Sequence, residues 1–164
     1  MTRTLLLMRH AKSDWEAGYE SDHERPLNKR GVRSARVMGR LLADEGLVPD
    51  VAISSTAVRA RNTAELAIEA GSWETELRLD RSLYESGPEG VLATGASASD
   101  AGRLMLVGHQ PTWSMLVAGL TGERIVMKTA TVAVVEVEVG SWDDLPTATG
   151  SLTRVLGPRT PTVH

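Results

Sequence analysis

The stretch Leu5-Leu6-Leu7-Met8-Arg9-His10 decides the fold, because an uninterrupted apolar run ends there in a guanidinium and an imidazole. A short apolar run is typical of a strand buried on both faces, as in a parallel sheet covered by helices. An Arg side chain holds an anion with a rigid fork of donors. A neutral His beside it can attack what the Arg holds. We therefore predict a buried strand over residues 4–8 with part of an anion site at its end.

The composition is that of an ordinary globular protein. The chain has 164 residues, of which 41% are apolar and 24% are charged. This length is typical of one domain with a substantial core. We expect a single domain over residues 1–164, with a loose tail from about residue 157.

The overall charge argues against two classes of partner. The net charge is −3 and the pI is near 5.8, which gives no general attraction to nucleic acid or to an anionic membrane. Cys is absent, which excludes disulfides and thiolate sites. The first apolar run is too short for the core of a signal peptide, and no segment has the length of a membrane span. We expect a cytoplasmic protein that binds neither nucleic acid nor membrane.

Strand-like and helix-like segments alternate along the chain, which predicts an α/β fold. Periodicity predicts strands over residues 4–8, 51–53, 77–79, 103–107, 131–139 and 152–156, and helices over residues 27–45, 56–70, 88–96 and 111–120. Residues 12–25 are too polar for a core element, and residues 141–150 are expected to form a loop. The alternation predicts three layers, α/β/α, with a mostly parallel sheet and helices on both faces.

Local signals mark some of the element ends. Asn28 can cap the first helix, and Gly46 and Gly71 stand where helices are expected to end. The Val-Glu alternation in residues 131–139 predicts a half-exposed strand. Residues 152–156 are expected to return beside it as a hairpin partner.

Three strand ends carry the polar residues that matter most. Arg9-His10 follows the first strand, Ser54-Ser55 and Arg59 follow the second, and His109 follows the strand that ends at residue 107. Ligands of open α/β sheets bind beyond the carboxyl ends of the strands. We therefore expect two Arg and two His side chains to meet at one sheet edge.

Each of these residues also has an ordinary explanation. Arg9-His10 alone could be a surface pair, Arg59 could face solvent, and His109 could belong to a turn before Pro111. The arginines at positions 30, 33, 36 and 40 are best explained as a solvated helix face, and His23 and His164 are assigned no role. The convergence of three strand ends is hard to explain by chance, so we favour a binding site.

Three motifs, in this order, resemble those of the histidine phosphatase superfamily, also called phosphoglycerate-mutase-like. Leu6-Leu7-Met8-Arg9-His10-Ala11-Lys12-Ser13 resembles its RHG/RHA signature, Ser55-Thr56-Ala57-Val58-Arg59-Ala60-Arg61-Asn62-Thr63-Ala64 its second element, and Val107-Gly108-His109-Gln110-Pro111 its second-histidine element. The short length, Arg25-Pro26-Leu27 and Met127-Lys128-Thr129-Ala130 are most similar to the SixA-type phosphohistidine phosphatases. The resemblance covers nearly the whole chain.

The resemblance implies a role for each of the four residues. His10 would attack phosphorus and carry the phosphoryl group, while Arg9 and Arg59 hold its oxygens and His109 donates a further hydrogen bond. Phosphoryl transfer depends mainly on such positioning and electrostatic stabilisation. Water would then hydrolyse the phosphoenzyme. No metal or other cofactor is expected, because the arginines supply the positive charge.

The leaving group is the open question. An alkoxide needs a general acid, whereas the imidazole of phosphohistidine needs much less help. Larger members of the superfamily carry an acidic residue for this protonation step, whereas SixA-type members resemble a smaller core without that inserted residue. Glu85 is the candidate acid in this chain, although it could equally be an ordinary loop residue, and Asp14 and Glu16 are weaker candidates.

The primary hypothesis is a metal-independent phosphatase with a phosphohistidine intermediate, acting on a phosphohistidine protein or a small phosphorylated molecule. Short loops predict an open, shallow pocket that suits either substrate. The alternative enzyme is a phosphomonoesterase with Glu85 as general acid, and the compact chain disfavours a mutase. The non-enzyme alternative is a phosphate-recognition or scaffold module, against which the complete Arg-His-Arg-His set argues.

Overall fold

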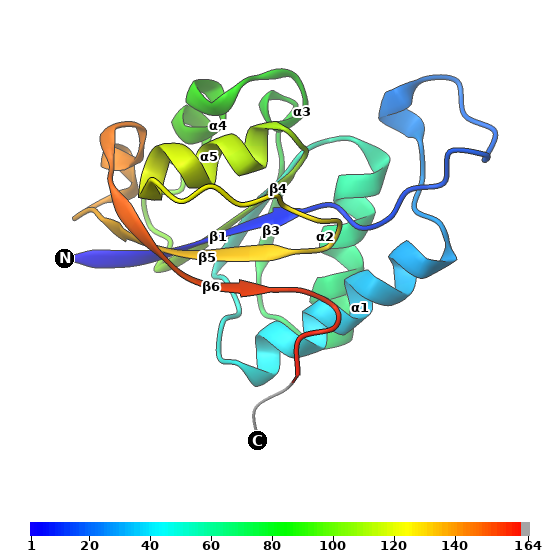
Figure 1. Ribbon diagram of the computed structural model, residues 1–164, viewed down its shortest axis with the longest axis horizontal. Helices are drawn as coiled ribbons and strands as arrows, with labels where there is room; N and C mark the ends of the chain where they lie inside the picture. The colour runs from blue at the N-terminus through cyan, green and yellow to red at the C-terminus, as the bar shows by residue number, and fades with distance from the viewer. Residues whose placement is uncertain (162–164) are drawn as a thin grey trace.

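Six strands form the centre of the structure, and all of them belong to one sheet. The computed structural model describes residues 1–161. The strands are β1 (Thr2–Arg9), β2 (Val51–Ser54), β3 (Glu76–Leu79), β4 (Arg103–Gly108), β5 (Val132–Glu138) and β6 (Gly150–Leu156). Their order across the sheet is β3-β2-β4-β1-β5-β6 (Figure 1). β3, β2, β4 and β1 run parallel, whereas β5 and β6 are antiparallel to their neighbours. The predicted mostly parallel sheet and the hairpin partner are confirmed.

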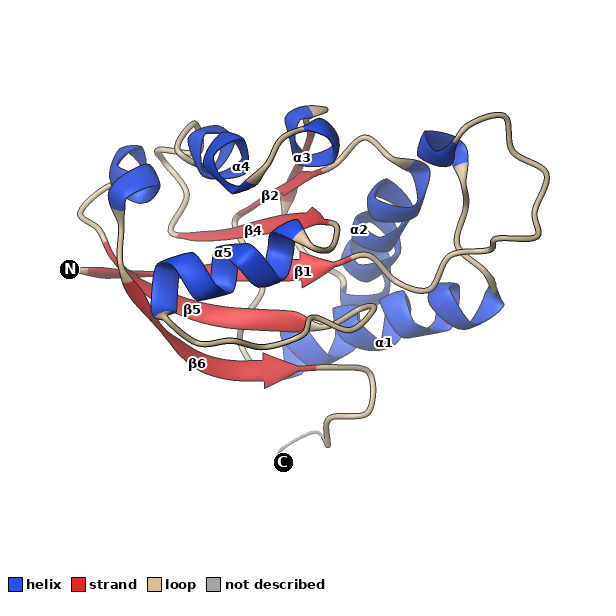
Figure 2. Cartoon of the chain, turned by 45° about the horizontal axis from the view of Figure 1, so that its top comes forward, coloured by secondary structure: helices blue, strands red, loops and turns tan. Residues whose placement is uncertain are grey.

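Helices cover both faces of this sheet. They are α1 (Lys29–Asp44), α2 (Val58–Gly71), α3 (Ser82–Glu85), α4 (Pro88–Gly95) and α5 (Thr112–Thr121), with two 3₁₀ helices, η1 (Asp22–Glu24) and η2 (Trp142–Thr147). α1 and α2 lie on one face, and α4 and α5 lie on the other (Figure 2). The predicted three-layer architecture is confirmed.

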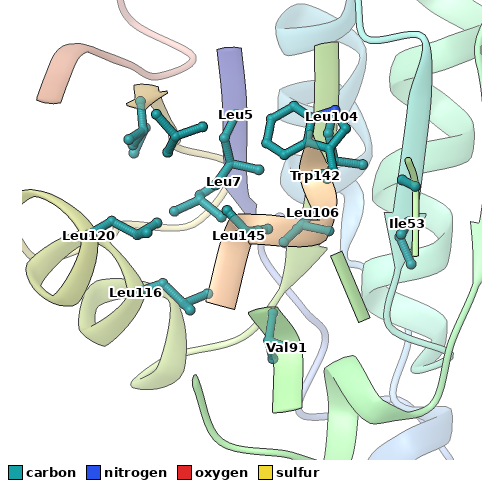
Figure 3. Close-up of a cluster of buried hydrophobic side chains, with 14 of the residues drawn as sticks. Leu5, Leu7, Ile53, Val91, Leu104, Leu106, Leu116, Leu120, Trp142 and Leu145 are labelled. Atoms are coloured by element: carbon teal, nitrogen blue, oxygen red, sulfur yellow. The ribbon is translucent and has the colours of Figure 1, made fainter. Parts of the chain in front are cut away.

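The apolar run of β1 is buried because its side chains alternate between two cores. Leu5 and Leu7 pack with α4, α5 and η2, whereas Leu6 and Met8 pack with α1 and α2. Figure 3 shows the first of these cores, in which Leu5, Leu7 and Leu116 of α5 are labelled. β1 lies between β4 and β5, so helices cover its side chains on both faces. An apolar run in place of alternation is the expected result.

β5 is not the half-exposed strand that its Val-Glu alternation predicts. Residues 132–135 and Val137 are buried, Glu136 is partly buried, and only Glu138 is exposed. β5 lies between β1 and β6, and its side chains enter both cores. Glu136 is accommodated because its carboxylate accepts a hydrogen bond of 2.7 Å from the Thr4 hydroxyl.

Two further local predictions need correction. The segment over residues 141–150 is not a simple loop, because η2 buries Trp142, whose indole N–H donates to the Ala101 carbonyl oxygen at 2.6 Å. Gly71 is the last residue of α2 rather than a residue beyond it, and Ser72 takes the left-handed conformation (φ 54°). Gly71 serves close packing: a Cβ there would lie 2.3 Å from the Gly39 carbonyl oxygen.

The first helix begins as the sequence predicts. The Asn28 side chain accepts a hydrogen bond from the Gly31 N–H at 2.8 Å, and Gly46, just beyond the helix, has a φ of +69°. Gly31 also lets the helix approach the segment after β1, because a Cβ there would lie 2.0 Å from the Lys12 carbonyl oxygen. The Asn28 N–H donates to that same oxygen at 3.0 Å. The start of α1 is thereby fixed beside the end of β1.

The parallel strands point their carboxyl ends toward one side of the molecule. In Figure 2 the arrowheads of β1 and β4 point toward the side where the long segment between β1 and α1 lies. Arg9 and Gly108 are register partners at these two ends. The sheet therefore brings the ends of separate chain segments together, as predicted. None of the helices within residues 1–161 is both long enough and apolar enough to cross a membrane.

Candidate active site

A cavity of about 250 Å³ lies at this edge of the sheet. Its lining residues come from the end of β1 and the long loop after it, from the start of α2, and from the segments after β4 and before β5. They are Arg9, His10, Lys12, Ser13, Trp15, Arg25, Arg59, His109, Gln110 and Thr129. The four residues that the sequence predicts to meet, Arg9, His10, Arg59 and His109, are all in this set. The lining holds four cationic side chains and two imidazoles, and it includes no carboxylate. We refer to it as the active-site cavity.

The main chain of His10 is held by its neighbours on both sides. Its N–H donates to the Gly108 carbonyl oxygen at 3.0 Å, and its own carbonyl oxygen accepts from the Ala130 N–H at 3.0 Å. Ala130 takes a positive φ of 60°, a conformation that an Ala adopts only where its surroundings hold it there. The position of His10 is therefore set by β4 and by the turn before β5.

The side chain of His10 is held in one tautomer. Nδ1 lies 2.7 Å from the Ala11 carbonyl oxygen. A carbonyl oxygen can only accept, so Nδ1 carries the proton, and Nε2 of the neutral ring keeps its lone pair. Ala11 is itself fixed, because its N–H donates to the Thr63 hydroxyl at 3.0 Å. His10 thus has a nitrogen free to act as a nucleophile.

The surroundings of His10 keep its ring neutral. Burial, with only 6% of the residue exposed, is the main cause that lowers the pKa of His10 to about 4. The hydrogen bond to Ala11 acts in the opposite direction, and the positive charges of Arg59, Arg9 and Arg25 lower the pKa further. At neutral pH the ring is therefore uncharged and can attack an electrophile through Nε2.

The two predicted arginines are positioned in different ways. Arg9 at the end of β1 donates from Nη1 to the Met127 carbonyl oxygen at 3.0 Å. Arg59 lies in the first turn of α2 and is 5% exposed. Its Nη1 donates to the Asp22 carbonyl oxygen at 2.7 Å and its Nη2 to Asp22 Oδ2 at 2.9 Å. Both guanidinium groups also line the cavity, where each could bind an oxygen of an anion.

Asp22 of η1 forms ion pairs with two of the cationic side chains. Besides Arg59, its carboxylate pairs with Arg25 at 3.1 Å and accepts a hydrogen bond from the Tyr84 hydroxyl at 3.0 Å. Partial burial acts to raise the pKa of Asp22, but the hydrogen bonds from Arg59, Arg25 and Tyr84 lower it to about 2 overall. Asp22 is therefore ionised at neutral pH. It orients Arg59 and Arg25 and cannot donate a proton there.

His109 is the second imidazole of the cavity. Its ring centroid lies 5.2 Å from that of His10, and its Nε2 lies 2.8 Å from the Ser55 hydroxyl. Burial and then the charge of His10 lower the pKa of His109 to about 3, so the ring is neutral. Nδ1 is buried and has no partner within residues 1–161. His109 can therefore take part in a hydrogen bond in the cavity without adding a positive charge.

The candidate acids lie outside the cavity lining. Glu85 is at the end of α3, its side chain is 56% exposed, and it pairs with Arg81. Asp14 Oδ1 accepts a hydrogen bond from the Glu16 N–H at 3.0 Å, and neither residue lines the cavity. Tyr84, the neighbour of Glu85, packs its ring edge-on to His109 with centroids 5.5 Å apart. Glu85 is thus next to a residue of the site without being in it.

Several residues around the cavity were not predicted to matter. Asp22 orients Arg59, and Tyr84 donates a hydrogen bond to Asp22. The centroid of the exposed Trp15 ring lies 3.5 Å from the Arg25 guanidinium carbon. The Asp22/Arg25 spacing of three residues in a polar loop is the signal that could have identified the pair, because one turn brings such residues together.

The sequence assigns no role to His23 or His164, and the structure describes only the first of them. His23 is only partly exposed: its Nε2 lies 2.8 Å from the Thr56 hydroxyl, and its ring packs edge-on to Tyr84. It holds η1 against the start of α2. His164 lies outside the described residues. In residues 1–161, no three His, Cys, Asp or Glu side chains gather as a metal site would require.

Comparison with known proteins agrees with this geometry. The sequence profile of the histidine phosphatase superfamily (branch 1) matches residues 5–88. An uncharacterized protein of Mycobacterium tuberculosis is 36% identical over 165 aligned positions, which cover 93% of this chain and 100% of the relative. A second uncharacterized protein, from Mycobacterium leprae, is 32% identical, with the same coverage of both chains.

Solved structures give the same result. A candidate phosphohistidine phosphatase SixA from Nakamurella multipartitia is 31% identical and superposes with a TM-score of 0.84 over 98% of each chain. A candidate SixA from Agrobacterium tumefaciens is 29% identical, with a TM-score of 0.80 over 95% of this chain and 98% of that one. The fold, the profile and these relatives show that the chain belongs to the histidine phosphatase superfamily (branch 1) and is a phosphatase.

Proposed function

We propose that this phosphatase acts on protein phosphohistidine through a phosphohistidine intermediate on His10. The observation that carries the proposal is the lining of the active-site cavity: it combines a neutral nucleophilic imidazole with cationic side chains, and no carboxylate is among the residues that form it. Such a site can hold a phosphoryl group and attack it. It offers little help to a leaving group that must be protonated.

The first step is an in-line displacement at phosphorus. His10 Nε2 forms a bond to phosphorus as the P–N bond of the substrate breaks, and the bonding electron pair leaves on the substrate imidazole nitrogen. The other nitrogen of the substrate ring carries a proton, so the departing imidazole is neutral. The Nδ1 proton of His10 stays in its hydrogen bond to the Ala11 carbonyl oxygen. Arg9 and Arg59 bind the non-bridging oxygens, and His109 supplies a neutral hydrogen bond.

The second step releases inorganic phosphate. A water molecule attacks phosphorus on the side opposite to His10, the P–Nε2 bond breaks, and the electron pair returns to Nε2. The depressed pKa of His10 favours this release, because the departing imidazole is stable in its neutral form. His10 is then ready for another cycle.

The carboxylates near the site favour this substrate class. Asp22 is ionised and bound to two arginines, so it is a poor proton donor. Glu85 does not line the cavity and pairs with Arg81. An imidazole leaves without a strong general acid, whereas an alkoxide does not. The geometry therefore supports phosphohistidine better than an alkyl phosphate.

The second candidate function is a phosphomonoesterase that uses Glu85 as general acid. The contact between Tyr84 and His109 favours it, since this contact brings the chain next to Glu85 close to the cavity. Glu85 would have to leave its ion pair with Arg81 and turn toward the cavity.

One set of assays separates the two functions. Turnover of a phosphohistidine peptide, an aryl phosphate and an alkyl phosphate is measured for the natural chain, for His10→Gln and for Glu85→Gln. We expect kcat/KM to be highest for the peptide and lowest for the alkyl phosphate, because the demand for an acid rises in that order. His10→Gln should abolish all three, and Glu85→Gln should leave them unchanged. Preferred turnover of the alkyl phosphate, lost in Glu85→Gln, would establish the second function instead.

A further inference from the structure

A second hollow, of about 550 Å³, lies directly beside the active-site cavity. Its walls are the segment after β1, the first turns of α1, the residues before β5 and the turn after β6. The lining residues are Lys12, Arg30, Ser34, Lys128, Thr129, Thr131, Gly157, Pro158, Arg159 and Thr160. We call it the basic groove. In Figure 1 the red turn that follows β6 lies near α1, and residues of both segments line the groove.

The charge of the basic groove is uniformly positive. Four cationic side chains line it, and no carboxylate does. Within the described part of the chain, none of the four takes part in an ion pair, whereas Arg154 nearby in sequence is paired with Glu45. In a chain with a net charge of −3, an unneutralised group of this kind attracts anions locally.

The walls of the groove are held by the main chain. The Lys12 carbonyl oxygen accepts from the Asn28 N–H at 3.0 Å, which ties the segment after β1 to the start of α1. The turn after β6 is closed by two bonds of 2.9 Å, from the Gly157 N–H to the Thr160 hydroxyl and from the Thr160 N–H to the Gly157 carbonyl oxygen. The cationic side chains therefore project from fixed supports.

The groove and the active-site cavity adjoin one another. Lys12 and Thr129 line both. A molecule whose phosphoryl group lies against His10 can therefore extend into the groove. Arg30, which the sequence alone explains as part of a solvated helix face, becomes a residue of this extension.

We propose that the basic groove binds an acidic segment of the phosphoprotein, next in sequence to the phosphorylated histidine. This inference rests on the proposed function and adds a determinant of substrate choice to it. The four cations come from separate chain segments and sit on long, exposed side chains. Such spacing fits several carboxylates spread along an extended chain. A single compact phosphate is better held by converging, buried arginines, as in the active-site cavity.

The test compares two phosphohistidine peptides that differ only in the residues beside the phosphorylated His, Asp and Glu in one and Asn and Gln in the other. We expect kcat/KM for the acidic peptide to be about tenfold higher, since two or three exposed ion pairs each contribute about a two- to threefold effect. The double variant Arg30→Gln/Lys128→Gln should reduce this ratio to about threefold or less. The ratio of the two peptides is measured on each variant, so any general loss of activity cancels.

A matched control removes the same charge elsewhere. Arg33→Gln/Arg36→Gln takes two exposed arginines from the same helix, and neither lines the groove. This control should keep the tenfold ratio. The ratio should also shrink in 0.5 M salt, because exposed ion pairs are screened.

The outcomes separate this inference from the proposed function. Equal kcat/KM for the two peptides, or an equal loss in the control variant, overturns the groove proposal while phosphohistidine turnover stands. A preference for a small bisphosphorylated compound without any preference for the acidic peptide also overturns it. If neither peptide is hydrolysed although an aryl phosphate is, the proposed function fails. In that case, binding of the unphosphorylated acidic peptide to the groove is measured by fluorescence anisotropy. The Kd of this peptide should rise about tenfold in Arg30→Gln/Lys128→Gln. An unchanged Kd refutes the proposal that the groove binds an acidic segment.

Discussion

The neutral state of His10 leads to a prediction about acid pH. Burial and three nearby arginines lower the pKa of His10 to about 4 from an ordinary value of 6.5. At pH 5 a ring with a pKa of about 4 is about 90% neutral, whereas an ordinary imidazole is about 3% neutral. The fraction of enzyme with a usable nucleophile should therefore be about thirtyfold greater at pH 5 than it would be with an unperturbed histidine.

The titration of the free enzyme should be followed by NMR of the imidazole nitrogens. This readout avoids the ionisation of a phosphate substrate, which falls in the same pH range. His10→Gln identifies the His10 signals by their loss, and a short histidine peptide serves as the unperturbed reference. We expect the neutral His10 ring to show a protonated Nδ1 and a free Nε2, because Nδ1 faces the Ala11 carbonyl oxygen.

Two results would refute this account of the nucleophile. One is a His10 midpoint near 6.5, which would mean that burial and the arginines do not act on the ring as its position implies. The other is a neutral ring with its proton on Nε2, which would remove the lone pair needed for attack. A corresponding check applies to His109: His10→Gln should raise the pKa of His109, since the charge of His10 is the second cause of its depression.

Three further predictions concern the supports of the site. Asp22→Asn should lower the free energy of unfolding in urea by about 1 kcal/mol at pH 7. The pKa of Asp22 near 2, in place of 3.8, limits the contribution of its charge to about 2.5 kcal/mol. Because half of the Asp22 side chain is exposed, solvent reduces this contribution. This contribution is present above pH 3.8 and is lost as the pH falls toward 2, so an undiminished difference at pH 2 would contradict it. Gly31→Ala should destabilise the chain by about 1–3 kcal/mol in thermal unfolding, because its Cβ would meet the Lys12 carbonyl oxygen, while Gly119→Ala in α5, where a Cβ has open space, is the control and should show no loss. Arg59→Lys should lower kcat/KM for an aryl phosphate by about 10²–10³-fold. Its free energy of unfolding should also fall, by about 1 kcal/mol, because Lys cannot make both bonds to Asp22, and full activity would argue against a role of Arg59 in binding the phosphoryl group.

The sequence predicted the strands and the convergence at the sheet edge because those features are local or follow from topology. The run at residues 5–8 identified β1, and the parallel order then placed Arg59 and His109 near His10. The burial of β5 could not be predicted, because it depends on β6 and on helices far away in sequence. Its Val-Glu alternation is the pattern of a strand with one wet face, and only the three-dimensional structure shows both faces covered.

The electrostatics of the site were harder to predict than its residues. Asp22 lies in a polar loop without periodicity, and its role depends on contacts with Arg59 and Tyr84, which are 37 and 62 residues away. Glu85 was predicted from its position after a short strand, and the structure places it beside the cavity and not in its lining. Side-chain direction at the end of a four-residue helix is set by tertiary packing, and no sequence pattern specifies it.

The anchoring of the His10 main chain has a consequence for how this scaffold could be altered. The bonds to Gly108 and Ala130 fix the nucleophile through main-chain N–H and C=O groups, which every amino acid except Pro possesses. Side chains that do not contact these anchoring residues can therefore be exchanged without displacing the reactive nitrogen. Loops from a relative with another substrate could be transplanted onto this sheet, and the chemistry should survive while the range of accepted molecules changes. Diversity of recognition and constancy of reaction are thus separable properties of this chain.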